Sequence, residues 1–157
     1  MTAKGDNSRE SLDLLGTKVT KVGTAMNAEF APIPSDVEAV AAAIVDAALQ
    51  VHRALGPGLL ESFYETCLCH ELAKRGIAFE RQRSWPIIYD SIRLHAGLRI
   101  DLLVAGKVIV ELKAVEQTIP LFEAKLLTYL KLTGLRVGLL INFNVALIKN
   151  GIKRLVR

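Results

Sequence analysis

Apolar residues recur at helical spacing after the proline-rich stretch that ends at Pro34. The positions that share one helical face are Val37, Val40, Ala41, Ile44, Ala48 and Val51. Their spacing predicts a helix with a buried stripe. Ser35 stands three residues before Glu38, the capping-box pattern in which each side chain bonds the other residue's free backbone N–H. The helix is therefore predicted to begin at Ser35 and to end before Gly56-Pro57-Gly58.

A second helix is predicted from Leu59 or Leu60 to Arg75, with Gly76 as the left-handed residue after its end. From Ile77 onward, apolar and polar residues alternate or form short apolar runs, which predicts strands. The predicted strand segments are Phe79–Trp85 and Ile87–Tyr89, which Pro86 separates, and then Leu98–Val104 and Val108–Lys113. The last two flank Ala105-Gly106-Lys107 and predict a β-hairpin.

The C-terminal third of the chain predicts one more helix and several strands. Pro120 opens a helix that runs through Leu132 and is closed by Gly134. The continuous apolar run Val137–Ile141 is typical of a strand buried on both faces. Val145–Lys149 and Ile152–Val156 predict an edge hairpin across Asn150-Gly151. This order of elements predicts an α/β or α+β fold in which helices flank a mixed sheet.

Composition narrows the class of protein further. The 157 residues suit a single domain, which we assign to residues 35–157 after a flexible polar leader at residues 1–34. No apolar run reaches the roughly 18 residues of a membrane span, and the N-terminus lacks the compact apolar segment of a secretory signal. We therefore expect a cytoplasmic protein without membrane association. The net charge of +4 is compatible with a polyanionic partner.

The apolar strands of the predicted hairpin carry charged residues inside their runs. Glu111 and Lys113 project from the same face of their strand because side chains alternate along it. Whether Asp101 joins them depends on the turn. A three-residue loop pairs Val104 with Val108 and places Asp101 opposite Glu111, whereas a two-residue turn sends Glu111 to the other face. We favour the three-residue loop because it gathers the charges together.

The carboxylates of Asp101 and Glu111, on directly opposite residues, repel each other unless a cation lies between them. Hard oxygen ligands suit Mg²⁺ or Mn²⁺, and Lys113 can orient a water or stabilise charge that develops on a phosphate. The alternative is a solvated ion pair of Glu111 with Lys113 or Arg99 on an exposed sheet face. The surrounding apolar runs favour a central location, where unpaired charges are costly.

Arg99-Ile100-Asp101 and Val110-Glu111-Leu112-Lys113 together resemble the core of the PD-(D/E)XK nuclease superfamily. More narrowly, Gly58-Leu59-Leu60-Glu61-Ser62-Phe63-Tyr64 resembles the naming motif of the bacterial GxxExxY family. The resemblance extends from about Val37 to Arg157. It implies a restriction-endonuclease-like fold, a mixed sheet flanked by helices with the acidic hairpin at its centre.

The resemblance also implies that Glu61 points at the metal site formed by Asp101 and Glu111, although an acid there also suits a helix N-terminus. Many members of the superfamily carry Gln-x-x-x-Tyr on the next helix, where this chain has Lys125 and Tyr129. Lysine at this position could bind a substrate phosphate, or compete with metal by pairing with Glu111. Gln82 and Tyr129 are further candidate substrate contacts.

His52 is a candidate phosphate or water contact, with a packed histidine as the alternative. The leading functional hypothesis is a Mg²⁺- or Mn²⁺-dependent phosphodiesterase that acts on nucleic acid, DNA ahead of RNA. A second hypothesis is a non-catalytic module that binds nucleic acid or a protein partner, and Lys125 is the residue that favours it. A third is an assembly subunit, in which the helix at Val37–Val51 packs on another chain or in a homodimer.

Overall fold

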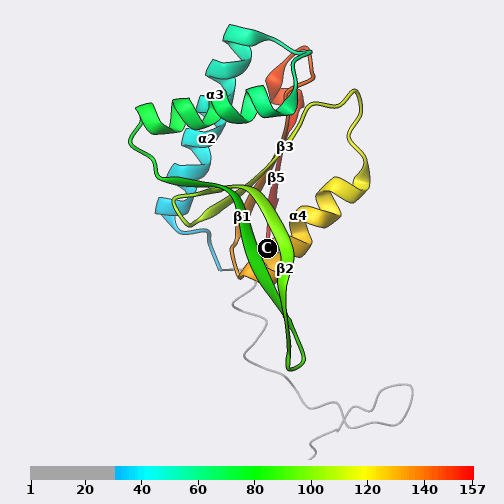
Figure 1. The fold of residues 1–157 in the computed structure, drawn as a ribbon. Coiled ribbons are helices and arrows are strands. Elements are labelled where there is room, and N and C mark those ends of the chain that lie inside the picture. Colours follow the sequence, from blue (N-terminus) through cyan, green and yellow to red (C-terminus); the bar gives the residue numbers. More distant parts are fainter. Residues whose placement is uncertain (1–30) are drawn as a thin grey trace, which may run out of the picture. The chain divides into compact units, whose positions relative to one another are not determined.

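A five-stranded sheet in the order β1-β2-β3-β4-β5 lies at the centre of the fold (Figure 1). The computed structural model describes residues 31–157, so most of the predicted leader, residues 1–30, lies outside the described residues. The strands are β1 (Phe79–Tyr89), β2 (Ile92–Val104), β3 (Val108–Lys113), β4 (Val137–Asn142) and β5 (Ile152–Val156). The helices are α2 (Ser35–Leu55), α3 (Glu61–Lys74), α4 (Pro120–Thr133) and the short 3₁₀ helix η1 (Ile148–Asn150).

The sheet is mixed, as predicted. Strands β3 and β4 run parallel, and the other three neighbouring pairs are antiparallel. Parallel neighbours need a crossover connection, and α4 supplies it. All six residues of β4 and the first five of β3 are buried, because these strands have neighbours on both edges and helices on both faces. The acidic hairpin is thereby placed at the middle of the sheet.

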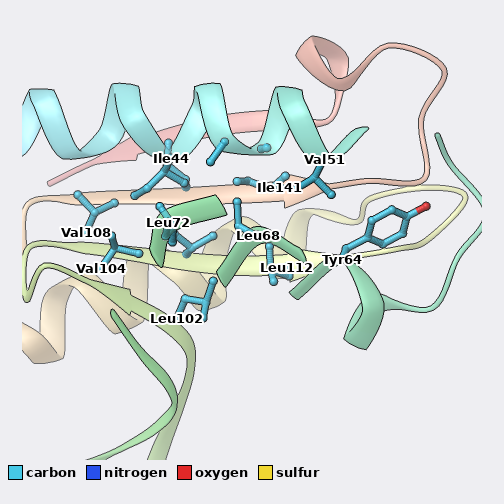
Figure 2. Packing of buried hydrophobic residues seen from close by; sticks show 14 of the residues in the cluster. Ile44, Val51, Tyr64, Leu68, Leu72, Leu102, Val104, Val108, Leu112 and Ile141 are labelled. Atoms are coloured by element: carbon cyan, nitrogen blue, oxygen red, sulfur yellow. The ribbon is translucent and has the colours of Figure 1, made fainter. Parts of the chain in front are cut away.

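Helices cover the two faces of the sheet in separate hydrophobic clusters. Helices α2 and α3 pack on one face, where Ile44 and Leu68 meet Leu102, Leu112 and Ile141 (Figure 2). Helix α4 packs on the other face, where its Leu126, Tyr129 and Leu130 form a cluster with residues of the sheet, namely Leu98, Ile100, Leu103, Ile109 and Leu140. None of the helices described over residues 31–157 is long and apolar enough to cross a membrane.

Strands β1 and β2 pair as a hairpin, and both are longer than the strand segments that the sequence predicted. Strand β2 begins at Ile92 rather than Leu98, and β1 continues through Pro86 with a register shift between Trp85 and Ile87. Ile87 pairs with Leu94, and Tyr89 pairs with Ile92. Pairing with β1 therefore extends β2 over residues whose own alternation of apolar and polar side chains is weak. The result is a two-stranded extension beyond the short β3 (Figure 1).

The predicted ends of the helices are confirmed, but the predicted capping box is wrong. Gly76 and Gly134 follow α3 and α4 with φ of +68° and +76°. Helix α2 begins at Ser35 with Pro34 as its cap residue, and no side chain caps it. Glu38 instead forms two hydrogen bonds of 2.6 Å with Arg154 of β5, so an ion pair with a distant strand replaces the local cap.

The predicted C-terminal hairpin is also wrong, because Val145–Lys149 is not a strand. Ile148 is buried against the α2 side of the core, and its segment forms η1. Strand β5 pairs with β4 instead, from Val137 opposite Val156 to Ile141 opposite Ile152. The open edge of β4 was available for this pairing, and only the assembled sheet reveals that edge.

Candidate metal and phosphate site

The turn between β2 and β3 sets the register of the candidate site. Ala105 and Gly106 have φ of +52° and +64°, and the Lys107 N–H donates to the Val104 carbonyl at 2.9 Å. Val104 pairs with Val108 and Leu102 with Val110. The predicted three-residue loop is therefore confirmed, and in this register Asp101 stands opposite Glu111.

Asp101 lies where the β2–β3 ladder ends. The last paired residues are Leu102 and Val110, and beyond them the Asp101 Oδ2 accepts a hydrogen bond from the Leu112 N–H at 2.9 Å. The Asp101 carboxylate thus accepts the hydrogen bond from the Leu112 N–H in place of a backbone carbonyl of a neighbouring strand. Burial raises the pKa of Asp101, and the neighbouring Glu111 raises it further against the opposing effects of the Leu112 N–H, Lys113 and Lys125.

Glu111 is the most deeply buried charged residue of the site, with 1% of its surface exposed. Its Oε1 accepts hydrogen bonds from Lys113 Nζ at 3.1 Å and from Lys125 Nζ at 2.5 Å. Its Oε2 is buried without a hydrogen-bond partner in the described part of the chain. A buried carboxylate oxygen without a donor is costly, and a cation is the usual group that offsets such a cost.

Lys113 is held in place from three directions. Besides Glu111, its Nζ donates to the Leu112 carbonyl oxygen at 3.1 Å and lies 5.0 Å from the centre of the Phe122 ring. The ammonium has three donors, so two hydrogen bonds to the protein leave one for a water or a phosphate oxygen. The side chain is 15% exposed, which keeps it near solvent at the edge of the site.

The start of α3 brings Glu61 toward the same charges. The Tyr64 hydroxyl donates to the Gly56 carbonyl at 2.7 Å and accepts from the Leu59 N–H at 3.0 Å, so it ties the glycine loop to the helix. Its buried ring stacks on Phe143 with the centroids 4.5 Å apart. Glu61 is the first residue of α3, and burial raises its pKa, with Lys113 lowering it and Asp101 and Glu111 raising it further.

Helix α4 supplies Lys125 and Tyr129, which share a face as their spacing predicted. Lys125 Nζ donates a hydrogen bond to Glu111 Oε1 and also lies 5.2 Å from the centre of the Tyr129 ring. Tyr129 itself is part of the hydrophobic cluster under α4. Of the two roles predicted for Lys125, the structure shows the pairing with Glu111 that would compete with a metal.

Two other predicted substrate contacts have partners within the protein. The His52 Nε2 donates to the Val145 carbonyl oxygen at 2.8 Å, and the ring is buried. No contact joins His52 to the two carboxylates in residues 31–157, which favours the packed alternative. The Gln82 side-chain amide donates to the Glu65 Oε2 at 2.8 Å. Their roles in substrate binding remain predictions.

The sequence matches a known family model over most of its length. The family model described as PD-(D/E)XK nuclease superfamily matches residues 38–155, which include all of these acidic residues and lysines. The chain belongs to the PD-(D/E)XK nuclease superfamily. No curated protein and no solved structure shows a significant match to it.

Two polar residues that the sequence did not single out, Glu65 and Asn142, support the candidate site. Glu65, one turn after Glu61, is buried and accepts hydrogen bonds from Arg81 and Gln82. Asn142, at the end of β4, bonds both the N–H and the carbonyl of Val115 and thereby fixes the segment that follows β3. The sequence signal for Glu65 was an acidic residue next to the apolar residues of α3. The signal for Asn142 was an amide side chain at the end of the apolar strand β4.

The residues present fit a divalent ion of the Mg²⁺ type in part. No three His, Cys, Asp or Glu side chains come together as a metal-holding group within the described range. Asp101 and the unpartnered Glu111 Oε2 form a two-carboxylate set, and Mg²⁺ is often held by only one or two carboxylates with the substrate phosphate. Glu61 as a third ligand remains a prediction.

The raised pKa of Asp101 predicts that its ionisation costs stability in the metal-free protein. The folded chain binds the proton more tightly than the unfolded chain, whose carboxyl titrates near 3.8. The loss of stability is absent below pH 3.8, where Asp101 is protonated in both states, and it is complete above the raised pKa of the folded protein. Asp101→Asn keeps an oxygen for the Leu112 N–H, and we expect it to raise the free energy of unfolding by roughly 0.5–1 kcal/mol at neutral pH.

Urea denaturation without metal at a series of pH values measures this effect. The advantage of Asp101→Asn is expected to grow as the pH rises from about 4 to neutrality. Asp46→Asn is the control, because Asp46 is an exposed acid on α2 that pairs with Arg75 far from the site. A lower stability of Asp101→Asn at neutral pH would contradict the prediction.

Proposed function

We propose that this chain is a metal-dependent nuclease that hydrolyses phosphodiester bonds of nucleic acid, DNA ahead of RNA. The observation that carries the proposal is the buried Glu111 Oε2, which has no donor among residues 31–157 and lies on the strand opposite Asp101. The superfamily to which the chain belongs supports nuclease activity. The motif from Gly58 to Tyr64 supports the narrower GxxExxY assignment, because its tyrosine bonds the backbone of Gly56 and Leu59 in the loop before Glu61.

In this proposal Asp101 and Glu111 hold Mg²⁺ or Mn²⁺, with Glu61 nearby as a third carboxylate. The ion would supply positive charge to the phosphate and make a water more acidic. Lys113 has one free donor and orients the attacking water or neutralises charge that develops on the phosphate. The contacts of its ammonium with Glu111, the Leu112 carbonyl and the Phe122 ring support this role.

Basic residues at the C-terminus contribute less to substrate binding than their number indicates. Lys153 pairs with Glu123 and Arg154 with Glu38, so both hold β5 against neighbouring helices. Arg81 and Arg83 pair with Glu65 and Glu80. Phosphate binding in the proposal therefore relies first on Lys113 at the site itself.

Plasmid cleavage in Mg²⁺ or Mn²⁺ tests the proposal. Wild-type protein is expected to cut, and Asp101→Ala and Lys113→Ala are each expected to lose at least about 100-fold in rate, since each removes a group that acts in the transition state. Lys131→Ala, an exposed lysine at the far end of α4, is the matched control. Equal rates in wild type and both site variants would remove the hypothesis.

One observation favours a second candidate, a module that binds nucleic acid or a protein partner without turnover. The 2.5 Å contact between Lys125 Nζ and Glu111 Oε1 already neutralises the carboxylate that a metal would use. In this case DNA binding falls with rising salt, and no divalent ion produces cleavage.

A further inference from the structure

Strands β1 and β2 exchange faces of the sheet at a single pair of residues. Leu98 and Ile100 belong to the cluster under α4, yet Leu102 and Val104 belong to the cluster under α2 and α3. Residues two apart on a regular strand share a face, so the backbone of β2 must rotate at Asp101. Strand β1 changes in the same place, because Phe79 packs with the α2 side and Trp85 with the α4 side.

Gln82 is the residue of β1 that stands opposite Asp101 at this crossing. Arg81 pairs with Leu102 and Arg83 with Ile100, while the position between them is missing from the ladder. Gln82 has a φ of +49°, a conformation that L residues other than Asn and Asp seldom adopt. A single left-handed residue in a strand rotates the chain and interrupts pairing, which accounts for the change of face.

The side chain of Gln82 is tied to helix α3. Its amide donates to Glu65 Oε2 at 2.8 Å, and the other oxygen of Glu65 accepts from the Arg81 Nε at 2.8 Å. Glu65 is 7% exposed, so its carboxylate lies largely out of water. Because the two donors are consecutive residues, the buried carboxylate fixes the backbone of β1 where it is strained.

We propose that Gln82 is a positioning residue whose bond to Glu65 holds the rotated backbone that turns Asp101 toward β3. Asp101 lies between Ile100 on one face and Leu102 on the other, and its carboxylate reaches the Leu112 N–H across the gap where β2 leaves β3. A regular β2 would direct the carboxylate to one face of the sheet. In this proposal Gln82 affects the metal site through the position of Asp101.

Amide hydrogen exchange at Leu112 reads the Asp101 contact directly and needs neither metal nor activity. Gln82→Ala removes the amide and disfavours positive φ, whereas Gln82→Gly removes the amide but accepts that φ without strain. Both variants are expected to lower the protection of the Leu112 N–H at least about tenfold. Arg75→Ala is the control, because it breaks bonds to Ala43 and Asp46 at the opposite end of α3.

The proposal is overturned if Leu112 keeps its protection in both Gln82 variants, or if Arg75→Ala lowers it as much. Calorimetric titration with Mn²⁺ is a second test of the Gln82 proposal, and it rests on the proposed function because it requires a metal site. If the wild-type protein binds Mn²⁺, the Gln82 variants are expected to bind about 10- to 100-fold more weakly. If it binds none, the metal site fails while the exchange experiment still decides the role of Gln82.

Discussion

Glu111→Ala is expected to lower the free energy of unfolding by about 3 kcal/mol in the absence of metal, the largest loss of any single change at the site. Glu111 is the partner of two lysine ammonium groups and is 1% exposed. Removing it leaves Lys113, which is 15% exposed, without its carboxylate, and it opens a cavity in the middle of the sheet. Lys125 is 39% exposed and can turn toward solvent, so its share of the loss is smaller.

Urea denaturation of Glu111→Ala and Glu111→Gln measures the effect. The amide variant keeps the volume and is expected to lose about half as much stability, since only charge is removed. Glu116→Ala is the matched control, because Glu116 is an exposed acid just after β3, and its effect should stay within about 0.5 kcal/mol. A Glu111→Ala protein as stable as wild type would show that the lysine pairs contribute nothing.

The expected contrast with Asp101 is informative about function. Asp101→Asn is expected to stabilise the metal-free protein, while Glu111→Ala destabilises it, although both remove a carboxylate from one site. The difference follows from their partners, because two lysines contact Glu111, whereas Asp101 has a backbone N–H and a neighbouring acid. A residue that costs stability in the resting protein is a candidate for a role in binding or catalysis.

Lys125→Gln is expected to strengthen Mn²⁺ binding about tenfold, because it removes the cation that occupies Glu111 Oε1. It also restores the residue that many members of the superfamily carry at this position. Without metal we expect a loss of no more than about 1 kcal/mol in stability, since the lysine is partly exposed and its pair is screened. Calorimetric titration with Mn²⁺ measures the affinity, and plasmid cleavage measures the rate.

Lys131→Gln is the matched control for Lys125→Gln, because it makes the same change of charge at the other end of α4. It should leave Mn²⁺ affinity unchanged. Unchanged affinity in Lys125→Gln together with slower cleavage would contradict competition with metal and assign Lys125 to phosphate binding instead. A rise in affinity without cleavage would favour the non-catalytic module.

The candidate site was predictable where local rules decide it. The turn at 105–107 left two registers open, and we favoured the three-residue loop because it gathers the charges. The structure confirms that register, with Asp101 opposite Glu111. The resemblance drew attention to Lys125, which could compete with a metal by pairing with Glu111, and the structure contains the hydrogen bond between Lys125 and Glu111. The capping box failed because Glu38 pairs with Arg154, and the two lie 116 residues apart in the chain.

The sequence alone determined the order of helices and most strands, the helix ends at Gly76 and Gly134, and the acidic hairpin. These features depend on periodicity and on backbone preferences that act over a few residues. The assembled fold was needed to show that β5 joins β4 and that Glu65 holds Gln82. Each of those contacts joins residues from different elements, whose meeting depends on how the sheet edges and helix faces pack.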